Sequence, residues 1–347
     1  MTSPTVEYHN KIKRVFNPLF LLYNLVMLDT GEKLGAFIVP TGVGAAFGGY
    51  AGDAACFARK FAQKSKLIVN PNVVNAGGFS GITNNMFYVE GYSLDEFFKG
   101  NINLIPAQNN KIGIVFDKAI PLDVLNVHIN TYNAVKCVYG IDILGYEITS
   151  DPVGVEFKME ENGISTGSVR NVETILEASK KLLQKGCNAV ALVCLFEDSF
   201  EDNPEYANSV GSDPVGGVEA IISHYISKEL KIPCAHSPAF IDYQIYPEIV
   251  DSHSASEYIT PTFLPCILLG LDIAPKLSTK DGISINNLDY LVMPYDSLGS
   301  TPVFEALKRN IPVYAIKTNT TVLNVVPEKI SSDIVVVNNF DDCLEII

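Results

Sequence analysis

Arginine is scarce in this sequence of 347 residues, with only four occurrences, at positions 14, 59, 170 and 309. Charged residues as a whole make up only 18%, and 39 acidic against 25 basic residues give a formal net charge of −14. Nucleic acids and anionic membranes are bound by clustered Lys and Arg, whereas the basic residues here are scattered. The composition therefore predicts no nucleic-acid partner.

A Cys-x-x-C pair is also missing, and the seven cysteines are an odd number. Most of them lie in apolar runs such as "GCNAVALVCLF" and "LPCILLGL". This pattern is typical of buried, reduced thiols and not of a disulfide framework. We therefore expect a cytoplasmic protein.

No apolar run is long enough to cross a bilayer, so we expect no integral membrane association. The stretch "KIKRVFNPLFLLYNLVML" places basic residues before apolar ones, as a signal peptide does. However, Asn17, Pro18 and Asn24 interrupt it, and no small-residue cleavage site follows. We interpret residues 1–34 as an N-terminal extension that packs on the domain, with plastid targeting as the alternative.

Apolar residues are abundant, at 47%. Continuous apolar runs such as "LGAFIVP", "KLIVNPN", "KIGIVF", "NAVALVCLF" and "LDYLVMP" alternate with helical patterns, which is typical of parallel sheets covered on both faces. The sequence predicts an α/β fold with a mostly parallel, Rossmann-like layered sheet and helices on both faces. The domain is expected over residues 35–347, with a soft internal boundary near residue 150. Two lobes and a homo-oligomer are both compatible with the pattern.

The string Ser-Asp-Pro-Val-Gly occurs twice, at residues 150–154 and 212–216. Asp, Pro and Gly in this spacing favour a type I turn. The first copy precedes an alternating run that predicts a strand, and the second precedes "GGVEAIISHYISKEL", which predicts a helix. We interpret the two copies as one kind of turn used twice, in preference to an internal repeat.

A glycine-rich segment, "VPTGVGAAFGGYAGDA", runs from Val39 to Ala54 between a predicted strand and a predicted helix. Doubly wound sheets bind ligands at such places, and glycines let backbone N–H groups approach an anion. The spacing matches neither G-x-G-x-x-G nor a P-loop, so a tight turn without a ligand stays an alternative. The residues expected to bind a ligand here are Thr41, Gly42, Gly44, Gly48, Gly49 and Asp53.

Other polar residues are predicted at the carboxyl ends of strands or at helix starts. Asn72 and Asn75 follow the second strand. Arg170 and Asn171 precede a predicted helix, where a guanidinium can hold a carboxylate or phosphate. Ordinary turn or surface roles are the alternatives. The remaining expected ligand contacts are Asp213, Gly216, Gly217, Ser300 and Asn319.

The candidate catalytic residues are His236, His224, Glu219 and Asp296. His224 points away from the apolar face of its predicted helix while Glu219 and Ser223 flank it, and His236 follows the short strand "IPCA". Such groups serve as general acids and bases. Their spacing matches no metal motif, and the sequence identifies neither a metal nor a cofactor. For His224 the alternative is a solvated helix residue.

Several stretches of the chain resemble an uncharacterised family of cyanobacteria, algae and plants, catalogued as domain of unknown function 3326. The resemblance runs from about residue 35 to the C-terminus and leaves residues 1–34 as an extension. It implies no particular reaction, but it makes a metabolic or plastid-linked role more plausible. The stretches that carry it are "VPTGVGAAFGGYAGDA", "NPNVVNA", "YVEGYSLDEF", "DPVGGVEAIISH", "IPCAHSPAF" and "TFLPCILLGL".

We therefore expect a small-molecule enzyme. It would bind an anionic metabolite, phosphorylated or carboxylated, at glycine-rich loops on the carboxyl edge of the sheet and transfer protons through a histidine and an acid. A non-catalytic metabolite-binding or assembly protein is the alternative. The expectation requires the Gly42–Asp53 loop, Arg170, His236 and Asp296 to meet around one hollow.

Overall fold

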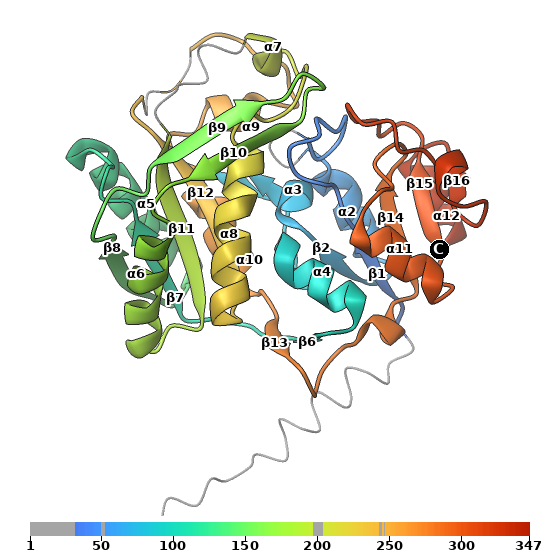
Figure 1. The fold of residues 1–347 in the computed structure, drawn as a ribbon, viewed down its shortest axis with the longest axis horizontal. Helices are drawn as coiled ribbons and strands as arrows, with labels where there is room; N and C mark the ends of the chain where they lie inside the picture. The colour runs from blue at the N-terminus through green and yellow to red at the C-terminus, as the bar shows by residue number, and fades with distance from the viewer. Residues whose placement is uncertain (1–31, 50–52, 197–203, 243–244, 246) are drawn as a thin grey trace, which may run out of the picture. The chain divides into compact units, whose positions relative to one another are not determined.

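The computed structural model describes residues 32–49, 53–196, 204–242, 245 and 247–347. Residues 33–347 form one compact unit, shown in Figure 1. The expected N-terminal extension, residues 1–34, falls almost entirely outside the described residues. Its predicted packing on the domain therefore stays a prediction.

Two parallel sheets organise the compact unit, which confirms the predicted α/β class. Numbered by their order along the chain, the strands of the larger sheet run 3-2-1-4-5-6, the order of a doubly wound fold. From edge to edge its strands are β5 (Met86–Tyr88), β2 (Lys66–Val69), β1 (Leu34–Phe37), β14 (Tyr290–Pro294), β15 (Val313–Ile316) and β16 (Val335–Val337). The smaller sheet consists of β8 (Ile143–Ile148), β7 (Ile112–Phe116), β11 (Ala189–Phe196) and β12 (Cys234–Phe240).

The chain contributes to the larger sheet twice, before and after it builds the smaller one. We call residues 33–105 and 276–347 the six-stranded lobe and residues 106–275 the four-stranded lobe. The segments that cross between them, β6 (Asn103–Ile105) and β13 (Lys276–Ser278), pair antiparallel with each other. The expected soft boundary near residue 150 stays a prediction.

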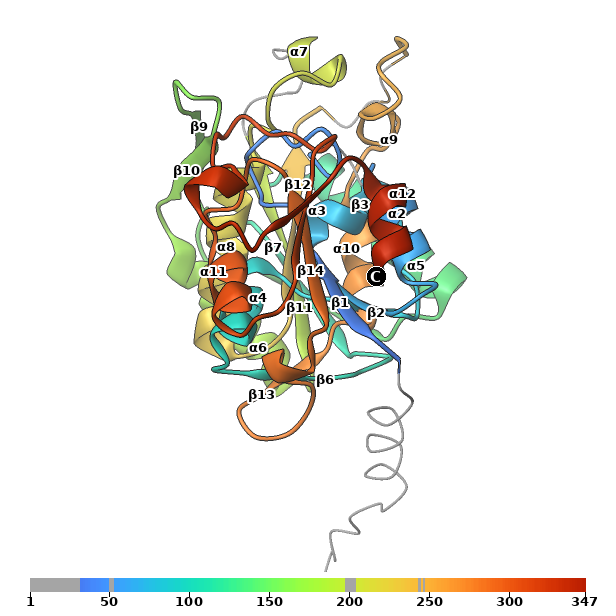
Figure 2. The same cartoon turned by 90° about the vertical axis from the view of Figure 1, so that its right-hand side faces the viewer.

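Helices cover both faces of each sheet. Figure 2 shows α4 (Gly91–Lys99) and α11 (Thr301–Lys308) on one side of the larger sheet, and α2 (Ala55–Phe61) and α12 (Phe340–Ile346) on the other. The smaller sheet lies between α6 (Val172–Gln184) with α8 (Gly216–Leu230) and α5 (Leu122–Tyr139) with α10 (Leu264–Asp272). In the part of the chain that the structure describes, no helix combines the length and apolarity needed to cross a bilayer.

Short elements complete the fold and lie mostly around the carboxyl ends of the large strands. The hairpin of β9 (Val155–Met159) and β10 (Ser165–Val169) and the small pair of β3 (Asn75–Ala76) and β4 (Phe79–Ser80) are antiparallel. The short helices are α3 (Pro71–Val74), α7 (Pro204–Ala207), α9 (Ala255–Tyr258), η2 (Ile285–Asn287) and η3 (Pro327–Lys329).

Burial on both faces explains why the strands read as unbroken apolar runs. Along β1, Leu34 and Ala36 pack into the core beside α4 and α11, while Phe37 packs on the opposite face, where its ring lies 5.4 Å from that of Phe340 in α12. The core that contains Phe37 continues into the smaller sheet through Ile112 and its neighbours. One apolar core therefore joins the two lobes.

The repeated Ser-Asp-Pro-Val-Gly turn feeds two different elements, as predicted. The first copy is followed by β9 and the second by α8. Within the second copy, the Asp213 side chain accepts a hydrogen bond from the Val215 N–H at 3.0 Å and closes the turn.

Candidate functional site

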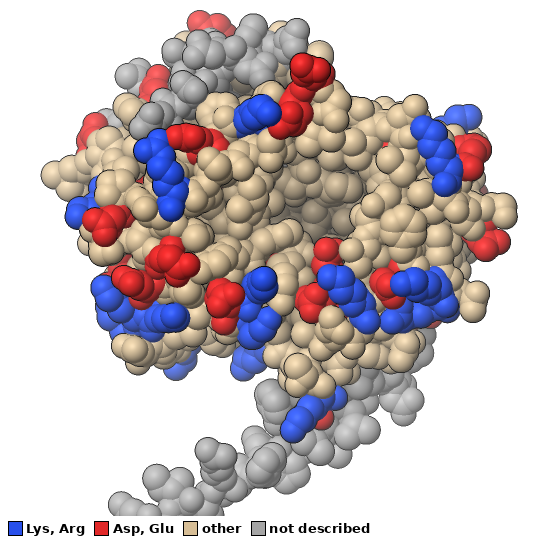
Figure 3. Space-filling model, in the orientation of Figure 1, with Lys and Arg blue, Asp and Glu red and all other residues tan. Residues whose placement is uncertain are grey.

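A cavity lies between the two lobes, at the carboxyl ends of their strands. It contains about 770 Å³ of empty space, counting the part that is open to solvent. Figure 3 shows the hollow on this face of the molecule, with most charged side chains around the periphery. Its walls come from the loops after β1 and β2, the N-terminal part of α8, β12, α9 and α10. This position agrees with the general rule for ligand sites in open α/β sheets.

The glycine loop that follows β1 forms one wall and packs closely against the four-stranded lobe. Gly44 has a φ of +54°, and a Cβ there would lie 2.4 Å from the Gly211 carbonyl oxygen. A Cβ at Gly42, whose φ is +72°, would lie 3.0 Å from the Ser165 carbonyl oxygen. These glycines are thus required for left-handed backbone and for close contact between the lobes.

Two asparagine side chains hold this loop in place. Asn319 donates to the Phe47 carbonyl at 2.9 Å and accepts from the Phe47 N–H at 2.8 Å. Asn70 makes the same pair of bonds with the backbone of Val39, at 2.7 and 3.1 Å. Asp53 accepts from the Gly48 N–H and contacts His253 Nδ1 at 2.8 Å. The loop is therefore pinned at both ends by buried side chains.

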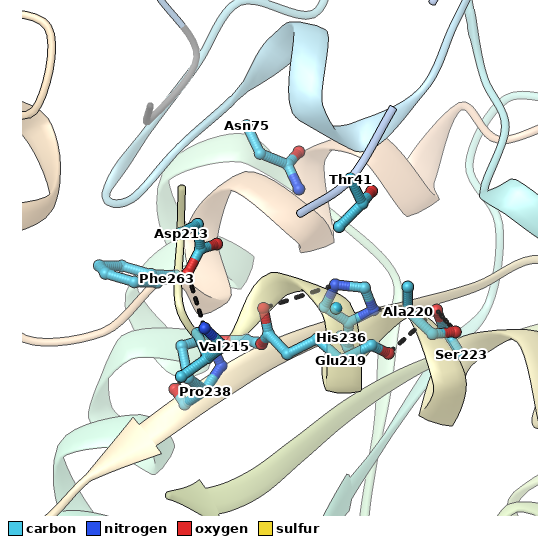
Figure 4. Close-up of polar contacts among 12 residues, drawn as sticks. Thr41, Asn75, Asp213, Val215, Glu219, Ala220, Ser223, His236, Pro238 and Phe263 are labelled. Atoms are coloured by element: carbon cyan, nitrogen blue, oxygen red, sulfur yellow. Dashed lines mark hydrogen bonds and ion pairs between the residues drawn. The ribbon is translucent and has the colours of Figure 1, made fainter. Parts of the chain in front are cut away.

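The opposite wall carries the titratable groups. Glu219 and Ser223 are four residues apart on α8, so they lie on the same helix face, and both are buried. That face packs on β12, where His236 is the third residue of the strand. The Nε2 of His236 lies 3.6 Å from Glu219 Oε2, and its Nδ1 lies 2.9 Å from Ser223 Oγ (Figure 4).

The hydrogen bonds of Ser223 are compatible with one tautomer of His236 that suits proton transfer. Ser223 Oγ lies 3.3 and 3.4 Å from the carbonyls of Ala220 and Glu219, either of which can accept its proton. Its lone pairs can then accept from His236 Nδ1–H. In this arrangement the neutral imidazole presents the lone pair of Nε2 to Glu219 and the cavity.

Burial moves the pKa values of this pair in opposite directions. Desolvation lowers the pKa of His236 to about 3, and the nearby charge of His224 adds to this. Desolvation raises the pKa of Glu219 well above its usual range, and the charges of Asp213 and Glu257 raise it further. These shifts favour a protonated Glu219 beside an unprotonated His236.

Two more carboxyl groups line the cavity. Burial raises the pKa of Glu257 to about 8, the charge of Asp213 adds to the rise, and a hydrogen bond with Tyr206 opposes it. Burial also raises the pKa of Asp213, against hydrogen bonds from the Val215 and Gly216 N–H groups. Within the described residues, no three His, Cys, Asp or Glu side chains form a group that could hold a metal ion.

Many of the residues predicted from the sequence do line this cavity. Two of the four candidate catalytic residues, Glu219 and His236, lie on its wall. His236 lies inside a seven-residue strand and not after a short one as predicted. The predicted ligand-binding residues on the wall are Thr41, Gly42, Gly44, Gly48, Gly49, Asn72, Asn75, Asp213 and Gly216.

The four groups that were expected to share one hollow do not all reach it. Arg170 is largely exposed on the hairpin side of α6, where it pairs with Glu156. Asn171 precedes α6 as predicted, but its side chain donates to the Pro152 carbonyl and does not cap the helix. Gly217 packs against the Ser165 carbonyl. None of these three lies on the cavity wall.

The rim after β14 is closed by the chain itself. Asp296 accepts from the N–H and hydroxyl of Thr321, both at 2.8 Å, and so holds the segment after β15 over this edge. The same segment bonds to the glycine loop through the Val322 N–H and the Val43 carbonyl. Asp296, Ser300 and Asn319 therefore lie outside the cavity wall, and Asn319 positions the loop.

His224 and Asp53 also differ from expectation. His224 faces the start of α4, since a Cβ on Gly91 would lie 2.2 Å from its Nε2. Asp53 lies behind the glycine loop in its pair with His253. Neither residue is on the cavity wall.

Three titratable wall residues were not predicted from the sequence, namely Glu257, Tyr206 and Cys266. Glu257 and Tyr206 lie in four-residue helices, which are too short to show a period. Cys266 reads as part of an apolar helix, and burial raises the pKa of its thiol to about 12. Cys266 is therefore a protonated thiol and not a nucleophile.

An uncharacterized lipoprotein of Synechococcus sp. is 36% identical to this chain over 305 residues, which is 84% of this chain and 83% of the relative. A lipoprotein is held at a membrane by its lipid, so this finding overturns the cytoplasmic location that the cysteines and the N-terminal stretch predicted. No solved structure matches the chain. The sequence profile of the family described as protein of unknown function (DUF3326) matches residues 35–347, and the chain therefore belongs to this family.

Proposed function

We propose that the protein is an enzyme that moves a proton between two positions of a small polar molecule bound in the cavity. The observation that carries the proposal is the buried pair of Glu219 and His236, 3.6 Å apart on the cavity wall. Such a pair, with the pKa of the acid raised and that of the base lowered, is typical of acid–base catalysis.

In the proposed reaction, His236 Nε2 removes a proton from the ligand while Glu219 delivers one to it. Ser223 keeps the imidazole in the required tautomer and orientation. The proton on His236 then returns to the Glu219 carboxylate, so the enzyme ends in its starting state. The net change is an isomerisation of the ligand, without an oxidant or a second substrate.

The ligand's charge is a separate question from the proton transfer. An anionic metabolite was expected from the sequence, and the glycine loop would offer it backbone N–H groups. Among the described wall residues there is no Lys or Arg to add to these. The proposal therefore rests on the acid–base pair and does not require an anionic ligand.

Deuterium exchange tests proton transfer without knowledge of the product. The protein is incubated in D₂O with mixtures of small polar metabolites, and deuterium entry at C–H positions is followed by NMR and mass spectrometry. We expect exchange in at least one compound, reduced about 100-fold or more by His236→Asn or Glu219→Gln. Glu229→Gln, an exposed position on the same helix, is the matched control and retains the rate.

Absence of exchange in every mixture would contradict the proposal. Binding is measured in parallel as a shift in melting temperature. If no exchange is found and a compound from these mixtures binds equally to the wild type and to His236→Asn, the protein is a non-catalytic metabolite-binding protein and not an enzyme.

A further inference from the structure

Three oxygen atoms on the cavity wall are buried without a hydrogen-bond partner among the described residues. They are Glu219 Oε1, Glu257 Oε2 and Asn75 Oδ1. Glu219 is only 6% exposed, and the Asn75 amide nitrogen is already used in a bond to the Tyr88 hydroxyl at 3.1 Å. Buried acceptors without donors are rare, because each costs about 1–3 kcal/mol. These three oxygens therefore lack donors.

Positive charge is missing as well. Asp213, Glu219 and Glu257 place three carboxyl groups on the wall, and the described wall residues include neither Lys nor Arg. The remaining basic group, His236, is neutral in its buried position. Without an opposite charge nearby, a buried carboxyl group favours its neutral form. A ligand that carries a positive charge would favour the ionised form and pair with it.

We propose that the cavity binds its ligand through a protonated amino group, which donates hydrogen bonds to Glu219 Oε1 and to the oxygens of Glu257 and Asn75. An ammonium group brings three donors and one positive charge. Figure 4 shows Asn75 across the cavity from Glu219 and His236, so the amino group would lie between the two lobes. The inference takes its site from the proposed function and adds the substrate class.

An ammonium in this position also changes the acid–base pair. It favours the ionised form of Glu219 and so promotes the transfer of the Glu219 proton to the ligand. Binding of the amine would thus favour the proton donation that the proposed reaction needs from Glu219.

Matched pairs of probes separate the amino group from the rest of a ligand. Binding of ethanolamine, alanine, glucosamine and putrescine is compared by calorimetry with ethylene glycol, lactate, glucose and 1,4-butanediol. In at least one pair we expect the amine to bind about tenfold to a hundredfold more tightly, as charge-assisted bonds allow.

The carboxyl variants assign the preference to the cavity. Glu219→Gln should remove the preference for the amine, and Glu229→Gln should keep it. Glu257→Gln is a second variant that should weaken the preference, and it decides the matter if Glu219→Gln does not fold.

Four outcomes bear on the inference. If no pair favours the amine, or if a hydroxyl compound binds more tightly, the inference is wrong. If Mg²⁺, Mn²⁺ or Zn²⁺ alone binds and Glu219→Gln abolishes that binding, the carboxyls belong to a metal site and the inference is also wrong. Amine preference without deuterium exchange would support the inference and contradict the proposed function. Deuterium exchange in a ligand that lacks an amino group would support the proposed function and contradict the inference.

Discussion

The two lobes contribute different chemistry to one cavity. The six-stranded lobe supplies a glycine loop and asparagine side chains, and none of its described wall residues titrates. The four-stranded lobe supplies every titratable group of the wall, including Glu219, His236, Asp213 and Glu257. One lobe thus provides shape and hydrogen bonds, and the other provides the titratable groups.

Different interactions hold the glycine loop and the titratable groups in place. The glycine loop keeps its shape because Asn70 and Asn319 satisfy its backbone from behind. The acid–base pair keeps its geometry because a helix face and a strand pack directly on each other, which sets Glu219, Ser223 and His236 side by side. If this division is correct, substitutions in the glycine loop of the six-stranded lobe should lower the free energy of unfolding. Substitutions of the titratable residues in the four-stranded lobe should change how that free energy depends on pH.

The largest effect is expected from Gly44→Ala. Its φ of +54° is strained for alanine, and the added Cβ would lie 2.4 Å from the Gly211 carbonyl oxygen. We expect the free energy of unfolding to fall by roughly 3–5 kcal/mol, measured by urea denaturation. Gly140→Ala is the control, since Gly140 has a φ of +72° with nothing within 4 Å of the added Cβ, and it should cost about 1–2 kcal/mol. Equal losses for the two variants would mean that contact between the lobes does not require Gly44.

An intermediate effect on the free energy of unfolding is expected from a change of pH, because folding shifts the pKa values of two groups in the four-stranded lobe. The pKa of Glu257 rises from 4.5 to about 8 on folding, so the stability it contributes is lost as pH rises through this range. The pKa of His236 falls from 6.5 to about 3, so its contribution is lost as pH drops below 6.5. The two trends oppose each other between pH 4.5 and 6.5, and only that of Glu257 continues from 6.5 to 8.

Urea denaturation at pH 6.5 and pH 8 measures this trend. We expect stability to fall with rising pH by about 1.4 kcal/mol per pH unit from Glu257 alone. The Glu257→Gln variant should lose that part of the slope. An unchanged slope in the variant would show that Glu257 does not titrate in this window.

The smallest effect is expected from Arg170→Ala, because Arg170 belongs neither to the glycine loop nor to the titratable groups of the cavity wall. The Arg170 side chain is 70% exposed and its partner Glu156 is 58% exposed, so the ion pair is weak. The free energy of unfolding should change by less than about 1 kcal/mol, and the affinity for any ligand found in the probe screens should not change. A loss of affinity in calorimetry would restore the role that the sequence suggested for this arginine.

Period and composition were sufficient to predict the α/β class and its long parallel strands and helices, because strands buried on both faces leave long apolar runs. They did not predict the division into two sheets or the short antiparallel pairs. The position of the glycine loop after a strand and before a helix could also be predicted, and the loop lines the cavity. The sequence could not show that the segment after β15 covers the edge beside Asp296, since that depends on contacts between distant loops. It could not identify Glu257 either, because a four-residue helix has no measurable period.

The order of the strands along the chain also affects how the protein can fold while it is being synthesised. The central strand β1 pairs with β14, more than 250 residues later, so the larger sheet lacks half of its strands until the C-terminal segment has left the ribosome. The strands of the smaller sheet all lie between Ile112 and Phe240, and this sheet can form first. The exposed edges of β1 and its neighbours would then need protection, so we expect the nascent chain to depend on chaperones more than its size suggests.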